Sequence, residues 1–206
     1  QTASCASERE WLASDPLSTL IPMKMVVLGG TGFLGSRAVA ALKTIPGAEV
    51  AVASRRGPVV VDFTKPETFT ALEPFALVVD LADSTTYAPD AVIAWCLSKG
   101  KTVIECSSDT RCVERLHGLG AKTTTGQLIL GGGIFTGVSN LLGRDVADQV
   151  GKAEHVTLGI STSPFSGGGQ SVAALMASTL ATPTVTYANG TRTEIVVRAV
   201  GQDAAV

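Results

Sequence analysis

The chain has 206 residues, of which 45% are hydrophobic and 17% are charged, and its formal net charge is −2. This length suffices for one large domain, or for one domain and part of a second. The near-neutral charge excludes the basic surface that nucleic-acid binding requires, the high hydrophobicity excludes global disorder, and no apolar run approaches the ~20 residues of a membrane span.

Both ends of the sequence differ from the middle. Residues 1–22 begin with Gln, carry three acidic side chains and lack the features of an export signal, whereas Met23 opens a segment that resembles a natural start. We therefore expect residues 1–22 to be an extension outside the fold; the alternative is a short helix that packs on the domain. The strand-like C-terminal segment stops abruptly, which predicts a fragment that lacks further C-terminal chain.

Short apolar segments alternate with helical patterns through residues 25–130. The expected strands are 25–28, 49–53, 59–61, 77–81, 102–105 and 128–130. Repeated strand–helix units predict a doubly wound parallel sheet, with helices on both faces and right-handed crossovers.

Helix signals fill the connections. Leu34, Ala38 and Leu42 recur every fourth residue and predict the buried face of the first helix. Residues 64–67 have the pattern of a capping box that opens a short helix, and Pro89 opens the next. The predicted core side of that helix carries Ala91, Val92 and Trp95.

The pattern changes after residue 131. Glycine triplets stand at 131–133 and 167–169. The elements expected there are helices at 139–150 and 171–180, a strand at 155–160, and a hairpin formed by 184–187 and 193–198. An antiparallel element after a parallel sheet predicts that residues 138–206 form an incomplete second, smaller α/β domain.

A glycine motif follows the first strand. Gly30-Thr31-Gly32-Phe33-Leu34-Gly35 fits G-x-G-x-x-G and opens the first helix. Gly30 would permit a tight turn, Gly32 would let the backbone approach a pyrophosphate, and Gly35 would let the helix pack closely. Phosphates would meet free N–H groups and the positive end of the helix. The alternative is a turn without a ligand; the context predicts a Rossmann-type, dinucleotide-binding domain at residues 23–137.

The end of the second strand bears on the choice of cofactor. An acidic residue there would bind a ribose 2′-hydroxyl and favour NAD, but this chain has Ser54, Arg55 and Arg56. Arginine forks match phosphate, so NADP (NADPH) is expected and NAD is less favoured. The alternative is a pair of solvated arginines.

Further cofactor contacts are expected at strand ends. Leu81 and Ala82 follow the fourth strand, at the edge where open α/β sheets bind ligands. Asp62 follows the third strand and either accepts from the adenine amine or is a turn residue.

The candidate acid–base groups are Asp80, Tyr87 and Cys106. Each also has a structural interpretation; Cys106 in particular is a small apolar filler in most such settings. Asp109 is expected to cap the helix that follows it. Neither tyrosine is followed four residues later by Lys, which excludes the chemistry of extended short-chain dehydrogenases, and no adjacent His activates Cys106 as a nucleophile.

The four cysteines form neither a metal-binding nor a disulfide pattern. We therefore expect no metal site, reduced thiols and a cytoplasmic location.

Four stretches together resemble the saccharopine dehydrogenase-like reductases. They are MVVLGGTGFLGSRAVAAL with EVAVASRR, VVDLADSTTYAPDAVIAWCLSKGKTVIECSSD, LILGGGIFTGVSNLLGRDVAD and SPFSGGGQSVAALMASTL. The resemblance implies an NADP-dependent oxidoreductase that transfers hydride to or from a C=N or C=O bond of an amino-acid-derived substrate. Phe135 and Thr136 replace an Asp-Pro pair of saccharopine-cleaving members, which argues against saccharopine itself.

The second domain would complete the substrate cleft. Ser166, Gly167, Gly168 and Gly169 precede a helix and would offer N–H groups to an anionic substrate, while residues 131–133 would close over the nicotinamide. A mobile loop without a ligand is the alternative. The expected partners are a small-molecule substrate and, through the second domain, a second copy of the chain, but no nucleic acid and no membrane. The alternative function is a non-catalytic dinucleotide-binding module or sensor.

Overall fold

The computed structural model describes residues 23–157, except 85, 108, 122–124, 135–136 and 152–153, together with the strands at 184–188 and 191–195. The chain divides into two compact units, residues 1–158 and 159–206. The predicted extension at 1–22, the second glycine triplet and the helix predicted at 171–180 lie outside the described residues. The predicted domain boundary at 137/138 falls within the first unit.

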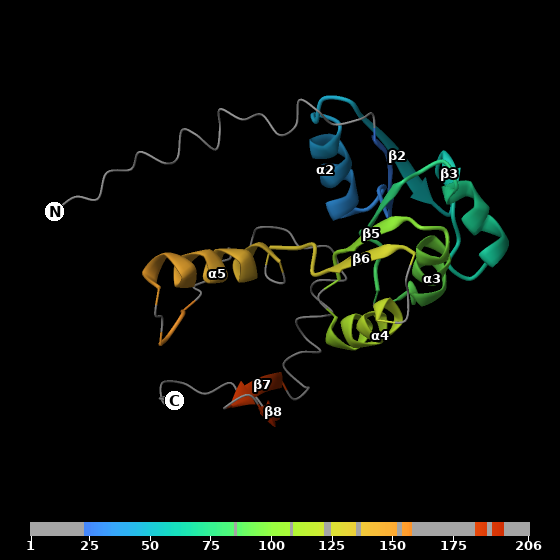
Figure 1. The fold of residues 1–206 in the computed structure, drawn as a ribbon. Helices are drawn as coiled ribbons and strands as arrows, with labels where there is room; N and C mark the ends of the chain where they lie inside the picture. Colours follow the sequence, from blue (N-terminus) through green and yellow to red (C-terminus); the bar gives the residue numbers. More distant parts are fainter. Residues whose placement is uncertain are drawn as a thin grey trace. The chain divides into compact units, whose positions relative to one another are not determined.

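A six-stranded parallel sheet forms the centre of the first unit (Figure 1). Its strands are β1 (Met23–Leu28), β2 (Ala48–Ser54), β3 (Val59–Val60), β4 (Leu77–Asp80), β5 (Thr102–Glu105) and β6 (Gln127–Leu130). They are ordered β3-β2-β1-β4-β5-β6, so the chain moves outward in one direction from β1 and in the other from β4. This order is that of dinucleotide-binding sheets and leaves a switch point between β1 and β4, where ligands bind. The predicted fold class is confirmed.

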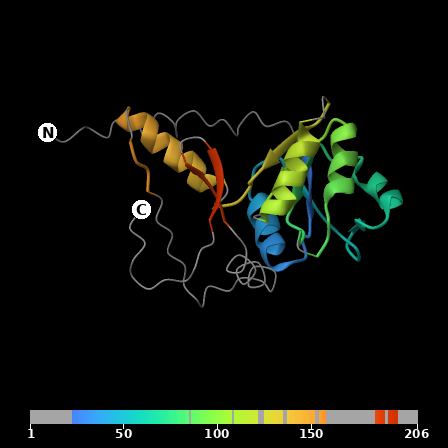
Figure 2. The same cartoon turned by 90° about the horizontal axis from the view of Figure 1, so that it is seen from below.

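Helices cover both faces of the sheet. They are α2 (Phe33–Leu42), the short 3-10 helix η1 (Pro66–Leu72), α3 (Asp90–Ser98) and α4 (Thr110–Gly120). Helix α2 packs on one face, and η1, α3 and α4 pack on the other, where α3 and α4 lie side by side (Figures 1 and 2). The next helix, α5 (Val138–Val150), has no buried residue in the structure.

The core follows the alternation of the strands. Along β1, Val26 and Leu28 face the larger cluster under η1, α3 and α4, whereas Val27 faces α2. Cys96 of α3 and Cys112 of α4 are buried in the larger cluster. Successive side chains of a strand point to opposite faces, and each face of β1 is therefore apolar.

The predicted face of α2 is wrong by one position at its start. Gly35 and Val39 are buried, whereas Leu34 is 53% exposed. Ala38 is half-buried, and Leu42 packs against the small cluster that contains Val39. Leu34 lies in the first turn of α2.

The predicted face of α3 needs a similar correction. Ala91 is exposed, and the buried positions are Val92, Ile93, Cys96 and Leu97. Trp95 is half-buried and meets Phe69 of η1 edge to face, with the ring centroids 6.4 Å apart. Because α3 contacts the sheet, η1 and α4, its buried face is wider than a single stripe.

The capping box predicted at 64–67 does not form. The N-cap position of η1 is Lys65, without a side-chain hydrogen bond, and the Thr64 hydroxyl donates instead to Asp62 Oδ1 at 2.7 Å. The prediction for Asp109 is confirmed, since its carboxylate accepts the N–H of Arg111 at the start of α4.

Two strands of the second unit are described. β7 (Thr184–Ala188) pairs antiparallel with β8 (Thr191–Ile195), which confirms the predicted hairpin. Residues 155–157 of the predicted strand 155–160 are irregular, and the rest of that strand lies outside the described residues.

Candidate functional site

The loop from β1 to α2 lies at the switch point of the sheet. Gly29 has a φ of 70°, so the tight turn predicted at Gly30 is made by the left-handed residue Gly29. Gly30 instead lies against β2, where an added Cβ would be 2.9 Å from Val52 Cγ1. The predicted close packing of Gly35 is confirmed, because its Cβ would be 2.7 Å from Gly30 Cα and closer still to the Gly29 carbonyl oxygen.

The start of α2 leaves backbone donors available. Gly32 N–H donates to Gly29 O, and the next bonded donor is Ser36 N–H, which reaches Gly32 O at 2.9 Å. Within the described residues, the intervening N–H groups of Phe33, Leu34 and Gly35 have no acceptor. A Cβ on Gly32 would meet only Gly29 O, at 3.2 Å, so the space beside its Cα is open in the described part of the chain. Free donors at the positive end of a helix suit an anion such as a pyrophosphate.

One basic residue at this loop is not evident from the motif. Arg37 donates to Phe33 O at 2.8 Å, and its guanidinium carbon lies 3.9 Å from the centroid of the Phe33 ring. The signal in the sequence is an aromatic and a cation four residues apart, which face each other on a helix. Arg37 adds positive charge to the loop.

The end of β2 adjoins the glycine loop. Gly29 N–H donates to Ala53 O at 3.1 Å, and the Ser54 side chain accepts the N–H of Arg56. Arg55 and Arg56 are both exposed in the turn that follows. The two arginines are therefore displayed beside the first glycine of the loop.

Asp62 is a turn residue in the structure. Its Oδ1 accepts from both the N–H and the hydroxyl of Thr64, and these bonds lower the pKa of Asp62, with smaller contributions from the charges of Lys65 and Arg55. The influence of Arg55 shows that Asp62 belongs to the same corner of the sheet. Its contact with adenine stays a prediction.

The segment directly after β4 packs against the β1–α2 loop on the side opposite β2. A Cβ on Gly29 would lie 2.8 Å from both Leu81 O and Ala82 N. The structure thus brings two of the predicted cofactor contacts, Leu81 and Ala82, against the first glycine of the β1–α2 loop. Only a glycine allows this approach.

Two buried carboxyls stand at the ends of β4 and β5. Asp80 is 2% exposed and Glu105 is 1% exposed. Asp80 Oδ1 accepts the N–H of Ala82, and Glu105 Oε1 accepts that of Ser107, whereas the buried Glu105 Oε2 has no hydrogen-bond partner among the described residues. Burial and the Glu105 carboxyl raise the pKa of Asp80 well above its ordinary value, and burial also raises the pKa of Glu105.

The other polar groups at this edge are also engaged. Ser84 and Ser107 hydrogen-bond through their hydroxyls at 2.5 Å, which joins the segments after β4 and β5. Burial, with the Glu105 and Asp80 carboxyls, raises the pKa of Cys106 to about 12. Cys106 is therefore a thiol at neutral pH, not a nucleophilic thiolate. The acid–base roles of Asp80, Tyr87 and Cys106 stay predictions.

Tyr87 contacts Arg55, a candidate cofactor-binding residue that lies on a distant segment of the chain. It lies in the segment between β4 and α3, and its ring centroid is 4.8 Å from the guanidinium carbon of Arg55. Because β1 separates β2 from β4 in the sheet, this contact spans the carboxyl end of β1. No pattern in the sequence indicates this pair.

The triplet 131–133 follows β6 at the same edge. Gly132 N–H donates to Glu105 O, and a Cβ on Gly132 would be 2.5 Å from Ile104 Cγ2 and 3.1 Å from Cys106 Sγ. The triplet therefore lies directly against the end of β5. Its contact with a nicotinamide stays a prediction.

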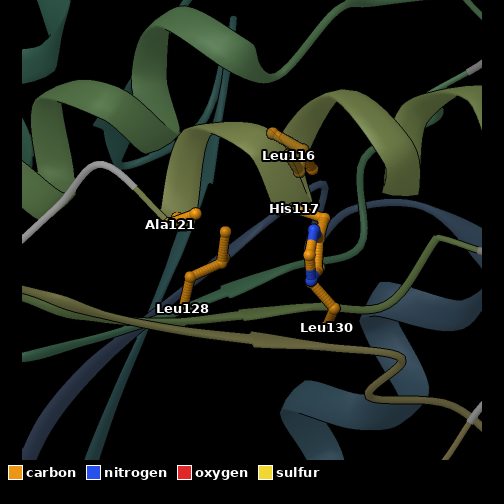
Figure 3. A pocket seen from close by; sticks show the side chains of 6 residues that line it. Leu116, His117, Ala121, Leu128 and Leu130 are labelled. Atoms are coloured by element: carbon orange, nitrogen blue, oxygen red, sulfur yellow. The ribbon is translucent and has the colours of Figure 1, made fainter.

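A separate apolar groove of about 220 Å³ lies between α4 and β6. Figure 3 shows His117 of α4 above Leu130 of β6, with Leu116, Ala121 and Leu128 beside them. None of the predicted cofactor residues lines this groove, so it is not part of the dinucleotide site.

The described residues contain no group of three or more His, Cys, Asp or Glu side chains that could hold a metal ion. Over the same part of the chain, every helix is too short or too polar to cross a membrane.

Solved structures are similar to parts of this chain. The apo form of saccharopine dehydrogenase (L-Glu forming) from Saccharomyces cerevisiae is 17% identical over 62% of this chain and 31% of that chain, with a TM-score of 0.50. An oxidoreductase of Klebsiella pneumoniae, titled putative, is 23% identical over 64% of this chain and 40% of that chain, with a TM-score of 0.41. No family model matches the sequence, and neither does any curated protein.

The likeness to the yeast enzyme agrees with the Rossmann-like α/β fold described above. The chain spans about a third of the length of the yeast enzyme that it matches.

Proposed function

We propose that the chain binds NADP(H) across the carboxyl edge of its parallel sheet and acts as an NADP-dependent oxidoreductase. The observation that carries this proposal is the β1–α2 loop at the switch point, where three N–H groups at the start of α2 have no acceptor among the described residues and the space beside Gly32 is open. These features fit a dinucleotide pyrophosphate.

Each part of the cofactor has candidate contacts. Gly30 through Gly35 would hold the pyrophosphate, Ser54, Arg55 and Arg56 would bind the 2′-phosphate, and Leu81 and Ala82 would line the site beside Gly29. Arginine suits a 2′-phosphate because its planar fork matches phosphate oxygens. When bound, NADPH would supply hydride, and the protein would supply orientation and electrostatics.

The substrate class rests on the sequence resemblance. We propose a small, amino-acid-derived molecule with a C=N or C=O bond, bound with the help of Ser166 to Gly169, in a cytoplasmic protein that pairs through its second domain.

The cofactor assignment is tested by titrating the full chain with NADPH and with NADH. We expect tighter binding of NADPH, and we expect Arg55→Asp to weaken NADPH binding about 10-fold or more, since a charge-assisted pair is replaced by a repulsive one. Lys24→Asp makes the same charge change at the amino end of β1, at the opposite edge of the sheet, and should leave the affinity for NADPH unchanged. Equal affinities of the wild-type chain for both cofactors would contradict the assignment to NADP.

A non-catalytic dinucleotide-binding module is the second candidate. It is favoured by the burial of Asp80 and Glu105 and by the protonated thiol of Cys106, which leave these three groups unsuited to act on a substrate. Oxidation of NADPH in the presence of 2-oxo acids and amines, followed by absorbance, separates the two candidates. Tight NADPH binding without turnover of any pair would favour the module.

A further inference from the structure

We propose that Tyr87 is a specificity-determining residue that positions Arg55 for the 2′-phosphate of NADP(H). This inference rests on the proposed cofactor. Tyr87 would then contribute to selectivity for NADP(H) over NAD(H), whereas its residue type alone suggested an acid–base role.

The contact has the geometry of a cation–π pair. The Arg55 guanidinium carbon lies 4.8 Å from the Tyr87 ring centroid, within the ~6 Å over which such pairs attract. Arg55 is exposed in the turn after β2, and Tyr87 is half-buried. The ring therefore offers a fixed surface to a side chain that would otherwise sample many rotamers in solvent.

The Tyr87 backbone is held by local hydrogen bonds. Its N–H donates to Asp83 O at 2.9 Å, and the Thr86 hydroxyl donates to Asp83 Oδ2 at 2.7 Å. These bonds close a turn directly after the β4 end that packs on Gly29. The position of the ring is thus tied to the same backbone that borders the glycine loop.

The contact with the ring is compatible with a free arginine fork. When a guanidinium lies parallel to a ring, its face makes the contact and its N–H donors point outward in the plane. Among the described residues, Arg55 makes no ion pair with a carboxylate, although the charge of Arg55 contributes to the lowered pKa of Asp62. A 2′-phosphate could therefore receive a bidentate pair from an arginine that is already oriented.

The location agrees with this role. The Arg55–Tyr87 pair crosses the carboxyl end of β1, between the ends of β2 and β4. The ribose of a dinucleotide whose pyrophosphate occupies the β1–α2 loop would approach the end of β2. A preformed pair at this point would act on the half of the cofactor that distinguishes NADP from NAD.

The test compares Tyr87→Leu and Tyr87→Phe in the full chain, with 2′,5′-ADP and 5′-AMP as probes beside NADPH and NADH. Leucine keeps an apolar side chain but removes the π face, and we expect affinity for NADPH and 2′,5′-ADP to fall about 2- to 5-fold relative to NADH and 5′-AMP. Phenylalanine keeps the face and should retain the wild-type ratio. A merely structural role would lower the affinities for both classes of ligand together.

A double-mutant cycle isolates the pair. In an Arg55→Met background, Tyr87→Leu should have no further effect on the ratio of the two affinities. The role of Tyr87 would be overturned if Tyr87→Leu left the ratio of the NADPH and NADH affinities unchanged. It would also be overturned if Tyr87→Leu lowered that ratio equally in the wild-type and Arg55→Met backgrounds. Either result would leave the NADP assignment in place. Equal binding of 2′,5′-ADP and 5′-AMP by the wild-type chain would overturn the NADP assignment, and this inference with it.

Discussion

Two glycine-rich loops leave the same edge of the sheet, one after β1 and one after β6, and they share a backbone design. Gly29 and Gly131 both have a positive φ, 70° and 73°. Gly30 and Gly132 each lie against a neighbouring strand, and a Cβ on Gly35 or Gly137 would fall on the carbonyl oxygen of Gly29 or Gly131. The glycines are needed in both loops because the backbone comes too close for any side chain.

The loops differ in how their helices begin. Helix α2 begins at Phe33, before the last glycine of its loop, whereas α5 begins at Val138, after Gly137. At the start of α5, the N–H groups of Val138 and Ser139 donate to Gly133 O and Ile134 O, whereas the donors at the start of α2 point to no described acceptor. Glycine content alone therefore does not decide whether backbone donors are left free; the place where the helix begins does.

The difference between the two loops is tested most directly by placing a negative charge at equivalent positions in each. Gly32 and Ile134 each stand three residues after the first glycine of their loops. Gly32→Asp should weaken NADPH binding at least about 100-fold, because a carboxylate would occupy the pyrophosphate position. Ile134→Asp is the matched control: Ile134 is 69% exposed, and the change should alter affinity less than about 2-fold. Similar losses in both variants, measured by fluorescence titration, would mean that the two loops serve one ligand equally.

A second pair of variants tests the shared design. Gly35→Ala and Gly137→Ala each force a Cβ onto a carbonyl oxygen, and each should lower the free energy of unfolding by about 3 kcal/mol. Gly118→Ala in α4 is the control, because its Cβ would have no atom within 4 Å, and it should raise that free energy by about 0.5–1 kcal/mol. Urea denaturation measures all three. A tolerated Gly137→Ala with a disrupted Gly35→Ala would show that only the first loop is closely packed.

The buried carboxyls between the loops give a smaller, pH-dependent effect. Asp80 and Glu105 have raised pKa values in the folded chain, so above about pH 4 the folded state binds more protons than the unfolded state. Their contribution to stability is full at lower pH and is lost as the pH rises through the folded pKa values. The free energy of unfolding should therefore fall from about pH 5 to pH 8, and more shallowly in Asp80→Asn. The exposed Asp145→Asn should keep the wild-type slope, and an identical slope in Asp80→Asn would contradict the assignment.

The sequence was sufficient for features that depend on local pattern. The strands at 102–105 and 128–130, the Asp109 cap and the antiparallel hairpin all follow from neighbouring residues, and the structure has them. The first glycine motif was likewise recognisable because strand, glycines and helix are contiguous. Its left-handed residue was misplaced by one, since G-x-G-x-x-G does not distinguish Gly29 from Gly30.

The contacts that could not be predicted join distant segments. The Arg55–Tyr87 and Asp80–Glu105 pairs depend on strand order and register, which bring the ends of β2, β4 and β5 to one edge. The apolar pattern also places Leu34 on the core side of its helix, whereas the structure leaves it 53% exposed.

Two buried thiols can report how often the layer formed by α3 and α4 opens. Cys96 and Cys112 lie in one apolar cluster, and burial raises their pKa values to about 12 and about 11. At neutral pH both are almost wholly protonated and shielded, so a thiol reagent reacts with them only after α3 or α4 opens. The rate of their modification in the native protein therefore reports how often this layer opens.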